Sequence, residues 1–390
     1  MYINFWYAMA MAEEITADKP FKVRRLGQDF VLYRDEDGSA HCLHDVCSHR
    51  GGSLGDGRIR DGHLECPYHG WQFNGGGDCA YIPSLGAEGQ KIPARTKIDS
   101  YPVQEKYGLI FAFLGDLPEA ERPPLMGPDW NPQNYEYPAE EWRAVAMSWP
   151  ITANYERCVE NGIDPSHNEY VHRAHGFMGD RQDTYKVNKL EPIEHQWGNG
   201  FWHRFYAPAS THDVLYKGEE ARDGEGDLNV SAGHSGPNQV WTYIHITDKN
   251  WMHQYLYETP VDETHTTAFN ISICNFLPEE IADDDEIKAM NASIAEEDVV
   301  VLEGIKPVKT PDDMTSEVLV PSDKAIFGYR QFIKEWDRRG WRIDTKAVKR
   351  DELEKVYAIP SPRRRKEKGW VFDTVPLIPA AKPEEVKKAG

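Results

Sequence analysis

Two short strings in the first part of the chain decide how it is interpreted: CSHRGGSLGDG at residues 47–57 and CPYHGW at residues 66–71. Each string supplies one thiol and one imidazole, from Cys47, His49, Cys66 and His69. Glycines and a proline stand among these residues and favour tight loops, whose backbone N–H groups can turn toward bound sulfur atoms. The two strings therefore predict a metal centre held between two loops.

The pairing of ligand types narrows the kind of metal centre. Zinc fingers usually take two cysteines from a turn and two histidines from a helix, so one of each per loop is a poor match. A Rieske [2Fe–2S] cluster has two cysteines on one iron and two histidines on the other, which these loops can supply. A zinc ribbon stays open as the alternative. Two further cysteines nearby, Cys42 and Cys79, are expected to be buried free thiols.

The same strings resemble the Rieske domain of ring-hydroxylating and demethylating oxygenases. The resemblance implies that the cluster ligands are Cys47, His49, Cys66 and His69. Respiratory-type Rieske proteins carry one further cysteine in each loop, joined as a disulfide, and Gly52 and Tyr68 fill those places here. This departure favours the oxygenase branch of the family.

The bulk composition of the 390 residues fits a soluble folded protein of two unequal domains. A net charge of −20 argues against a nucleic-acid partner, because phosphate binding requires a basic face. No apolar run approaches the roughly 18 residues that span a bilayer, and the apolar start of the chain lacks a basic leader, so neither membrane insertion nor secretion is expected. Six cysteines are too few for a disulfide scaffold and fit a reducing cytoplasm.

The chain is expected to be an α+β protein with a domain boundary near residue 130. Residues 1–130 contain short alternating strands between turns and are expected to form an all-β Rieske domain. Residues 131–390 contain longer strands and helices, and the resemblance implies a helix-grip catalytic domain, in which an antiparallel sheet carries helices. The clearest helix is expected over residues 283–305, where acidic residues favour the N-terminus.

A second constellation lies in NYERCVENGIDPSHNEYVHRAH, residues 154–175. Two histidines and a carboxylate with open positions form the facial triad of non-haem Fe(II) oxygenases. The string resembles the iron motif of the same family, which implies His167 and His172 as ligands. Their spacing turns a regular helix about 140° beyond a full turn, so a break or bulge is expected between them. His175 stays open as a substitute for either ligand.

The same motif contains Asn161 and Asp164, which are assigned to the catalytic site. Asp164 has two interpretations. It is either the N-cap of a following helix or the carboxylate that, in this family, bonds a cluster histidine of a neighbouring subunit. In the second case its partner is His69 or His49 across a subunit interface.

The third iron ligand is expected on the helix over residues 283–305, and the prediction is Asp298. Projected at about 100° per residue, Asp298 falls within an apolar stripe, where an unpaired carboxylate is costly to bury unless it binds a metal. The stripe consists of Ile287, Ile294, Val301 and Ile305. Glu297 lies at the edge of the stripe and Glu296 well away from it, so both are expected to face solvent. The string EEDVVVLE also resembles the third-ligand segment of the family, and pairing of Asp298 with an arginine stays open.

Together the two centres imply O2 activation at a mononuclear Fe(II), with electrons delivered through the cluster. The sequence has no dinucleotide fingerprint or flavin motif, so NAD(P)H is expected to be oxidised on a separate reductase, with or without a ferredoxin. The resemblance implies a homotrimer that places one subunit's cluster beside the next subunit's iron. The basic run at residues 363–366 is either a docking site for an acidic ferredoxin or a solvated surface.

The substrate is expected to be a small, ring-containing organic molecule, because aromatic residues of the C-terminal half could line an apolar pocket. Hydroxylation and oxidative demethylation share these metal sites. The alternatives are a Rieske electron-transfer protein without oxygenase activity, a dioxygenase that forms cis-diols, and a zinc-containing structural protein.

Overall fold

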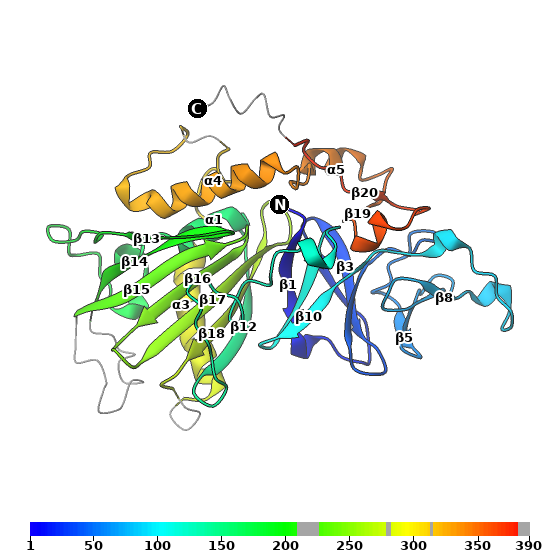
Figure 1. Cartoon of the computed structure of the whole chain (residues 1–390), viewed down its shortest axis with the longest axis horizontal. Helices are drawn as coiled ribbons and strands as arrows, with labels where there is room; N and C mark the ends of the chain where they lie inside the picture. The colour runs from blue at the N-terminus through cyan, green and yellow to red at the C-terminus, as the bar shows by residue number, and fades with distance from the viewer. Residues whose placement is uncertain (209–225, 278–281, 313–314, 381–390) are drawn as a thin grey trace. The chain divides into compact units, whose positions relative to one another are not determined.

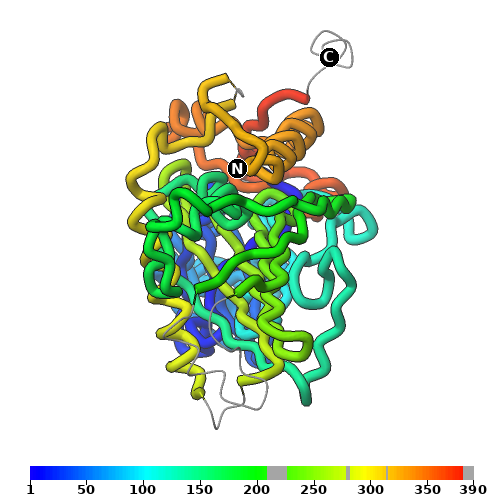
Figure 2. Tube along the Cα trace, turned by 90° about the vertical axis from the view of Figure 1, so that its left-hand side faces the viewer, coloured from blue at the N-terminus to red at the C-terminus, as the bar shows by residue number. Residues whose placement is uncertain are grey.

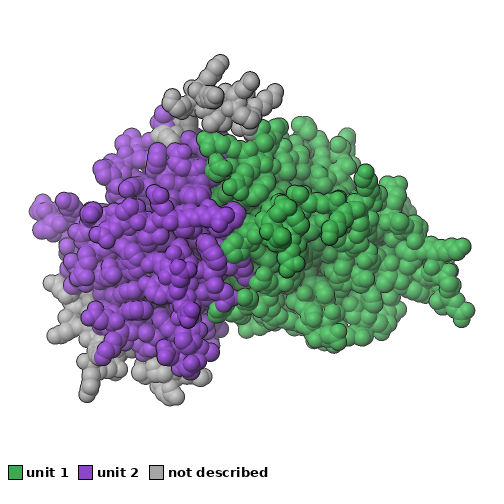
Figure 3. Space-filling view, in the orientation of Figure 1, with its two compact units in different colours: residues 1–124, 335–390 green, residues 125–334 purple. Residues whose placement is uncertain are grey.

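The computed structural model of the chain describes residues 1–208, 226–277, 282–312 and 315–380. It divides into two compact units, which Figure 3 colours separately: residues 1–124 with 335–390, and residues 125–334. The first boundary lies close to the one expected near residue 130. The expected second domain ran from residue 131 to residue 390. In the structure, residues from 335 onward pack with the first unit instead. The functional extents of the two domains stay a prediction.

Aromatic packing explains why the end of the chain joins the first unit. The ring of Trp336 packs edge-on against Tyr2 and Phe5, at centroid distances of 5.9 and 5.3 Å. The hydroxyl of Tyr2 donates to Asp337 at 2.7 Å. These contacts lie between residues more than 300 positions apart, which no local sequence pattern reports.

The first unit is built mainly from small antiparallel sheets (Figure 1), and the all-β expectation for the cluster-binding part is confirmed. The strand orders are β1-β11-β10, β2-β3-β4-β9 and β5-β6-β7-β8. The strand bounds are β1 Phe5–Met11, β2 Phe21–Arg25, β3 Gln28–Arg34, β4 Ala40–His44, β5 Arg58–Arg60, β6 His63–Glu65, β7 Gln72–Phe73, β8 Cys79–Tyr81, β9 Ser100–Tyr101, β10 Val103–Lys106 and β11 Leu109–Leu114. The end of the chain adds α5 Thr345–Asp351 and a parallel pair, β19 Tyr357–Ala358 and β20 Asp373–Thr374.

The basic run at residues 363–366 is tied into the first unit. Arg363 donates to Asp78 at 2.8 Å, Arg364 to the fully buried Asp99 at 2.6 Å, and Arg365 to Asp116 at 3.0 Å. The interpretation as a solvated surface is therefore wrong for Arg363 and Arg364, whereas docking of an acidic ferredoxin stays a prediction. The arginines pair with carboxylates from distant parts of the chain and hold the C-terminal segment against the first unit.

The second unit is one seven-stranded antiparallel sheet with helices, which confirms the expected architecture. The strand order is β12-β18-β17-β16-β15-β14-β13. The strand bounds are β12 Arg143–Ile151, β13 Glu191–His195, β14 Gly198–Ala207, β15 Gly226–Ser235, β16 Gln239–His245, β17 Trp251–Pro260 and β18 Thr266–Cys274. The helix bounds are α1 Tyr155–Gly162, α2 Asn168–Val171, α3 Asp284–Leu302 and α4 Lys324–Arg338, of which the last turn counts with the first unit.

The helices pack on one face of this sheet. Residues of α1 and α4 share a core with β14, β15 and β16, while α3 packs on β12 and β17. In Figures 1 and 2, α4 runs in orange across one end of the strands. A buried ion pair joins α1 to α4, because Arg330 donates to both carboxylate oxygens of Glu160, at 2.6 and 3.0 Å. In the described parts of the chain, no helix is both long enough and apolar enough to cross a membrane.

Local signals define α3. The side chain of Asp283 accepts from the N–H of Glu286, and the Glu286 side chain accepts from the N–H of Asp283, so a capping box begins the helix where the sequence predicts it. Of the expected apolar stripe, Ile287 is buried and packs against the sheet. Val301 is 42% exposed, so its assignment to the stripe is wrong.

Candidate metal centres

The two loops that carry Cys47 and Cys66 have the same backbone hydrogen bonds. In each loop the cysteine N–H donates at 2.8 Å to the carbonyl oxygen five residues later. The N–H of the glycine four residues later donates back to the cysteine carbonyl at 3.0 Å. These glycines, Gly51 and Gly70, have φ values of 76° and 70°, a conformation that glycine adopts without strain. The result is a matched pair of loops that present their cysteines alike.

The four predicted cluster ligands fall into two pairs within these loops. The thiols of Cys47 and Cys66 are buried (1% and 2% exposed), whereas the imidazoles of His49 and His69 are exposed, with ring centroids 4.5 Å apart. The Cys47 thiol lowers the pKa of the Cys66 thiol to about 6 by donating to it, and backbone N–H groups of the same loop act in the same direction. A lowered thiol pKa favours the thiolate that a metal requires.

The two loops approach each other closely at Gly52. A Cβ atom there would lie 3.2 Å from the Sγ of Cys66 and 3.5 Å from the Cβ of Tyr68. Gly52 and Tyr68, which fill the places of the two disulfide cysteines of respiratory-type Rieske proteins, therefore lie next to each other. Two buried thiols on one side and two exposed imidazoles on the other fit a [2Fe–2S] cluster of the Rieske kind. Cys42 and Cys79 are buried and free, as expected.

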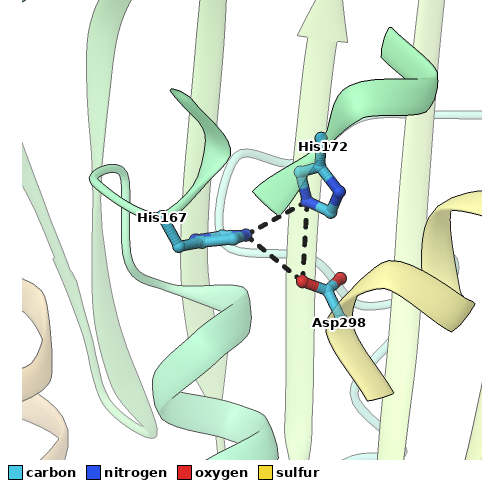
Figure 4. Close-up of side chains that lie close together, drawn as sticks. All are labelled: His167, His172 and Asp298. Atoms are coloured by element: carbon cyan, nitrogen blue, oxygen red, sulfur yellow. Dashed lines mark hydrogen bonds and ion pairs between the residues drawn. The ribbon is translucent and has the colours of Figure 1, made fainter. Parts of the chain in front are cut away.

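A second group of donors converges in the other unit (Figure 4). The Nε2 atoms of His167 and His172 lie 3.2 Å apart, and each lies 3.6 Å from the Oδ1 atom of Asp298. Two donors about 2.1 Å from one ion, at angles between about 90° and 109°, are themselves about 3.0–3.4 Å apart. The two histidines therefore have the separation that a single metal ion requires, and Asp298 from α3 completes the triangle at distances about 0.2 Å beyond this range.

The predicted break between the two histidines is present. Helix α2 is only four residues long, and His167 and His172 flank it as the residues before its first and after its last turn. His172 has φ −88° and ψ 72°, outside the helical region, which turns its ring back toward His167. Because His167 is the N-cap position of α2, the interpretation of Asp164 as the cap of this helix is wrong.

Hydrogen bonds at Nδ1 orient both imidazoles. The Nδ1 of His167 donates to the backbone carbonyl of Asp164 at 2.7 Å, and the Nδ1 of His172 donates to Glu297 at 3.3 Å. The second carboxylate oxygen of Glu297 accepts from the N–H of Ala174 at 2.9 Å. Both Nε2 lone pairs are then free to face a metal. The expectation that Glu297 faces solvent is wrong.

Asp298 carries the observation that most favours a metal. Its Oδ1 is buried and has no hydrogen-bond partner. Among the described residues, its ion-pair partners are the two imidazoles and not an arginine. Burial lowers the pKa of His167, which keeps that ring neutral and able to bind a cation. A cation between the three donors would satisfy the carboxylate, so the donor set fits a two-histidine, one-carboxylate iron site.

The other predicted residues surround this group. The carboxylate of Asp164 accepts from the N–H of Ser166 at 2.7 Å, and its other oxygen lies 3.9 Å from the Nδ1 of His167. Asn161 lines the adjacent cavity. His175 also lines it, with its ring 5.9 Å from that of His172, but the triangle of donors is complete without it.

The donor triangle opens on a cavity of about 250 Å³ between the sheet and the helices. Its walls come from α3, from the segment around α1 and α2, and from β14 to β18. Strand register aligns the wall residues: Phe201, Ala232, Thr242 and Gln254 are direct neighbours across four strands. The size and the mostly apolar wall suit a small organic molecule.

A pair of cluster-binding loops and a separate centre of two histidines and a carboxylate define an iron–sulfur protein with a second, mononuclear metal site. Comparison with known proteins agrees. Residues 5–102 match the Rieske [2Fe-2S] domain, and residues 151–339 match the vanillate O-demethylase oxygenase C-terminal domain. The chain belongs to the family of Rieske oxygenase terminal components.

Individual relatives support the same assignment. The chain is 37% identical over 171 residues to the dicamba O-demethylase oxygenase component of Stenotrophomonas maltophilia, covering 44% of this chain and 48% of that protein. It is 34% identical over 194 residues to 4beta-methylsterol monooxygenase of Methylococcus capsulatus, covering 50% and 48%. The chain thus spans about half the length of the curated relatives it matches. The crystal structure of dicamba monooxygenase bound to 3,6-dichlorosalicylic acid superposes with a TM-score of 0.71 at 26% identity, covering 87% of this chain and 98% of that one.

Proposed function

We propose that the protein catalyses the O2-dependent oxidation, by hydroxylation or oxidative demethylation, of a small ring-containing organic molecule. The observation that carries the proposal is the buried, partnerless Oδ1 of Asp298, which faces two oriented imidazoles at the wall of an apolar cavity. The chain also carries loops suited to a Rieske cluster, so it combines an electron-delivery site with a candidate O2 site. A pure electron carrier would need only the first of these.

The residues of the chain have distinct tasks in this reaction. His167, His172 and Asp298 would hold Fe(II), which supplies open positions for O2 when bound. The Asp164 carbonyl and Glu297 hold the two imidazoles in one tautomer and one orientation. The apolar wall positions the substrate and excludes water from it. Cys47, His49, Cys66 and His69 would hold the cluster that passes single electrons.

The overall reaction balances with two electrons and two protons. One oxygen atom of O2 enters a C–H bond of the substrate, and the other leaves as water. If the hydroxylated carbon is a methyl group on oxygen or nitrogen, it departs as formaldehyde and the substrate is demethylated. The electrons originate from NAD(P)H on a separate flavin reductase, directly or through a ferredoxin.

A homotrimer is part of the proposal. The dicamba O-demethylase relative is named as one component of a larger system, which supports a separate electron donor for this chain too. In the trimer, the carboxylate of Asp164 would bond His69 or His49 of the next subunit, with Asn161 beside it at the catalytic centre. Full coupled turnover by an Asp164→Asn variant with both metal sites loaded would remove this role, and light scattering checks the trimer. None of the six cysteines forms a disulfide, which supports a reducing cytoplasm as the location, and cell fractionation tests this.

Single turnover with ¹⁸O2 tests the activity. The chemically reduced holoenzyme is mixed with a panel of methoxylated and methylated ring compounds, and the products are analysed by mass spectrometry. One labelled atom in a hydroxylated product supports the proposal, and so does an unlabelled demethylated ring formed together with an equal amount of formaldehyde, which carries the label away. Two labelled atoms in one product indicate a cis-diol dioxygenase. Reversible reduction without any product would return the protein to the class of electron carriers, and colourless protein containing zinc would make it a structural zinc protein.

A further inference from the structure

We infer that the molecule held in the cavity is uncharged and carries a hydrogen-bond donor, such as an amide N–H or a hydroxyl, that the side chain of Asn270 accepts. The inference rests on the proposed function for its site and specifies the class of substrate. Three features of the wall carry it: its charges, one partnerless acceptor, and a second neutral polar group.

The charges of the wall come first. Among the described residues that line the cavity there is no lysine or arginine. The acidic side chains in the wall are Asp298, which belongs to the donor triangle, and Asp164 next to His167. Among the described residues a carboxylate or sulfonate in this cavity would find no cationic side chain, so the proposed Fe(II), whose charge Asp298 already partly neutralises, would alone have to offset the burial of the anion. The described part of the wall therefore favours an uncharged molecule over an acid.

Asn270 is the partnerless acceptor. It lies on β18, is 3% exposed, and its Oδ1 is buried without a hydrogen-bond partner. The residues directly beside it on the neighbouring strands are Leu256 and Met147, which have no N–H or O–H group in their side chains. A buried acceptor without a donor is costly, and such atoms are rare unless a ligand or water satisfies them. A donor on the ligand would satisfy this one.

A comparison within the same wall sharpens this point. Asn291 on α3 and Gln254 on β17 also line the cavity, and the Nε2 of Gln254 donates to the Oδ1 of Asn291 at 3.1 Å, so the acceptor oxygen of Asn291 has a partner. The acceptor oxygen of Asn270 has no such hydrogen-bond donor. Of the two asparagines, Asn270 is thus the one whose acceptor oxygen is available to orient a ligand.

His203 adds a second polar group that is neutral. It lies on β14, between the rings of Phe201 and Phe205 at centroid distances of 5.2 and 5.5 Å. Its Nδ1 is buried without a partner, and burial lowers its pKa to about 4, so it carries no positive charge at pH 7. Strands β15, β16 and β17 separate it from Asn270 in the sheet. Asn270 and His203 therefore offer the cavity two partnerless polar groups outside the donor triangle, and both are uncharged.

Anaerobic calorimetry on the iron-loaded holoenzyme tests the inference with three probes of one shape. The probes are 4-methoxybenzamide, which is neutral with an N–H donor, 4-methoxybenzoate, which is an anion, and 4-methoxyacetophenone, which is neutral without a donor. The amide should bind at least about tenfold more tightly than either of the others, because it alone satisfies a buried acceptor without burying a charge. Tighter binding of the benzoate, equal binding of all three, or no binding of the amide at millimolar concentration overturns the inference.

An Asn270→Leu variant isolates the contact. It should weaken binding of the amide about tenfold and leave the ketone unchanged, because only the amide uses the lost acceptor. The thermal midpoint of the variant should equal or exceed that of the parent protein. The reason is that an apolar side chain of similar size replaces a buried amide whose oxygen has no hydrogen-bond donor. Ser272→Ala, two residues along the same strand on the same face, is the matched control and should change none of the three affinities. Unaltered selectivity in Asn270→Leu would refute the role of Asn270.

These measurements separate the inference from the proposed function. Binding requires no turnover, so selective binding of the amide without any oxidised product would leave the inference standing and remove the oxygenase proposal. Turnover of the benzoate with no binding of the amide would leave the oxygenase proposal standing and overturn the inference.

Discussion

The second unit contains two histidine pairs with the same separation and different surroundings. The Nε2 atoms are 3.2 Å apart in His167 and His172, and also 3.2 Å apart in His245 and His253. The first pair faces the cavity and shares the buried oxygen of Asp298. The second pair lies in an aromatic cluster, where no aspartate or glutamate joins it among the described residues that could hold a metal.

Hydrogen bonding explains what the second pair does instead. A chain runs from the hydroxyl of Tyr243 to that of Tyr255 (3.2 Å), on to Tyr137 (2.6 Å) and then to the Nδ1 of His253 (2.7 Å). If each hydroxyl donates to the next, the Nε2 of His253 carries a proton that it can donate to His245. Every member then has a partner. The comparison teaches that the separation of two imidazoles does not define a metal site, whereas an unsatisfied carboxylate oxygen beside them does.

Metal content gives the largest expected difference between the pairs. Anaerobically purified protein should hold about three irons and two acid-labile sulfides per chain. A His167→Ala, His172→Ala double variant should fall to about two irons with sulfide unchanged, because only the mononuclear site loses its ligands. The matched control, His245→Ala with His253→Ala, should keep all three irons. Metal and sulfide analysis of the three proteins makes the test.

Two outcomes would break this comparison. Loss of iron from the control variant would mean that the second pair also binds metal. If the parent protein holds only the two cluster irons after reconstitution with Fe(II), the first pair binds no metal either, and both pairs are hydrogen-bonded elements of the fold.

The second prediction concerns the group that orients the first pair. Glu297 uses one carboxylate oxygen for His172 and the other for the N–H of Ala174, and a side-chain amide at this position could accept only one of these bonds. Glu297→Gln should therefore weaken Fe(II) binding about tenfold, as loss of an outer partner of a ligand histidine does. The neighbouring Glu296→Gln is the control and should have no effect. Competition with a chelator measures both affinities, and equal values would show that Glu297 does not orient the ligand.

The third prediction concerns how the second pair, His245 and His253, affects stability at acidic pH. Burial lowers the pKa of His253 to about 3 and that of His245 to about 4, below the value of about 6.5 for an unfolded chain. The folded state then binds fewer protons, so this part of the stability is complete above about pH 6.5 and is lost as the pH falls toward 4 and 3. The thermal midpoint should fall between pH 7 and pH 5, and it should fall less in a His245→Phe, His253→Phe variant. Parallel pH profiles for the two proteins would contradict this origin.

The sequence could predict the proposed metal ligands because their spacing is local. Cys47 with His49, and His167 with His172, lie within a few residues of each other, so the fold has little freedom to separate them. Asp298 could be predicted from helix geometry, because it falls on the apolar side of the helix, where burial of an unpaired charge is costly. Glu297 was misplaced although it is adjacent to Asp298, because its partners are His172 and Ala174, more than 120 residues earlier.

Long-range partners account for the other differences as well. The arginines of residues 363–366 find carboxylates up to 285 positions away, and composition alone cannot distinguish such ion pairs from a solvated surface. Asn270 carried no signal in the sequence either. Its role depends on strand register, which sets Leu256 and Met147 beside it, and on the lack of a partner for its Oδ1 among the described residues.

The smallest expected effect concerns one hydrogen bond of the second pair. Tyr137→Phe keeps the ring in the aromatic cluster and removes the hydroxyl that bonds His253 and Tyr255. The free energy of unfolding should fall by about 1–3 kcal/mol, the cost of leaving a buried polar partner unsatisfied. Iron content should stay at the parental value, because the hydroxyl orients His253 and neither of the proposed ligands. Denaturant unfolding together with metal analysis checks both, and iron loss without destabilisation would mean that the tyrosine chain serves the metal centre rather than the fold.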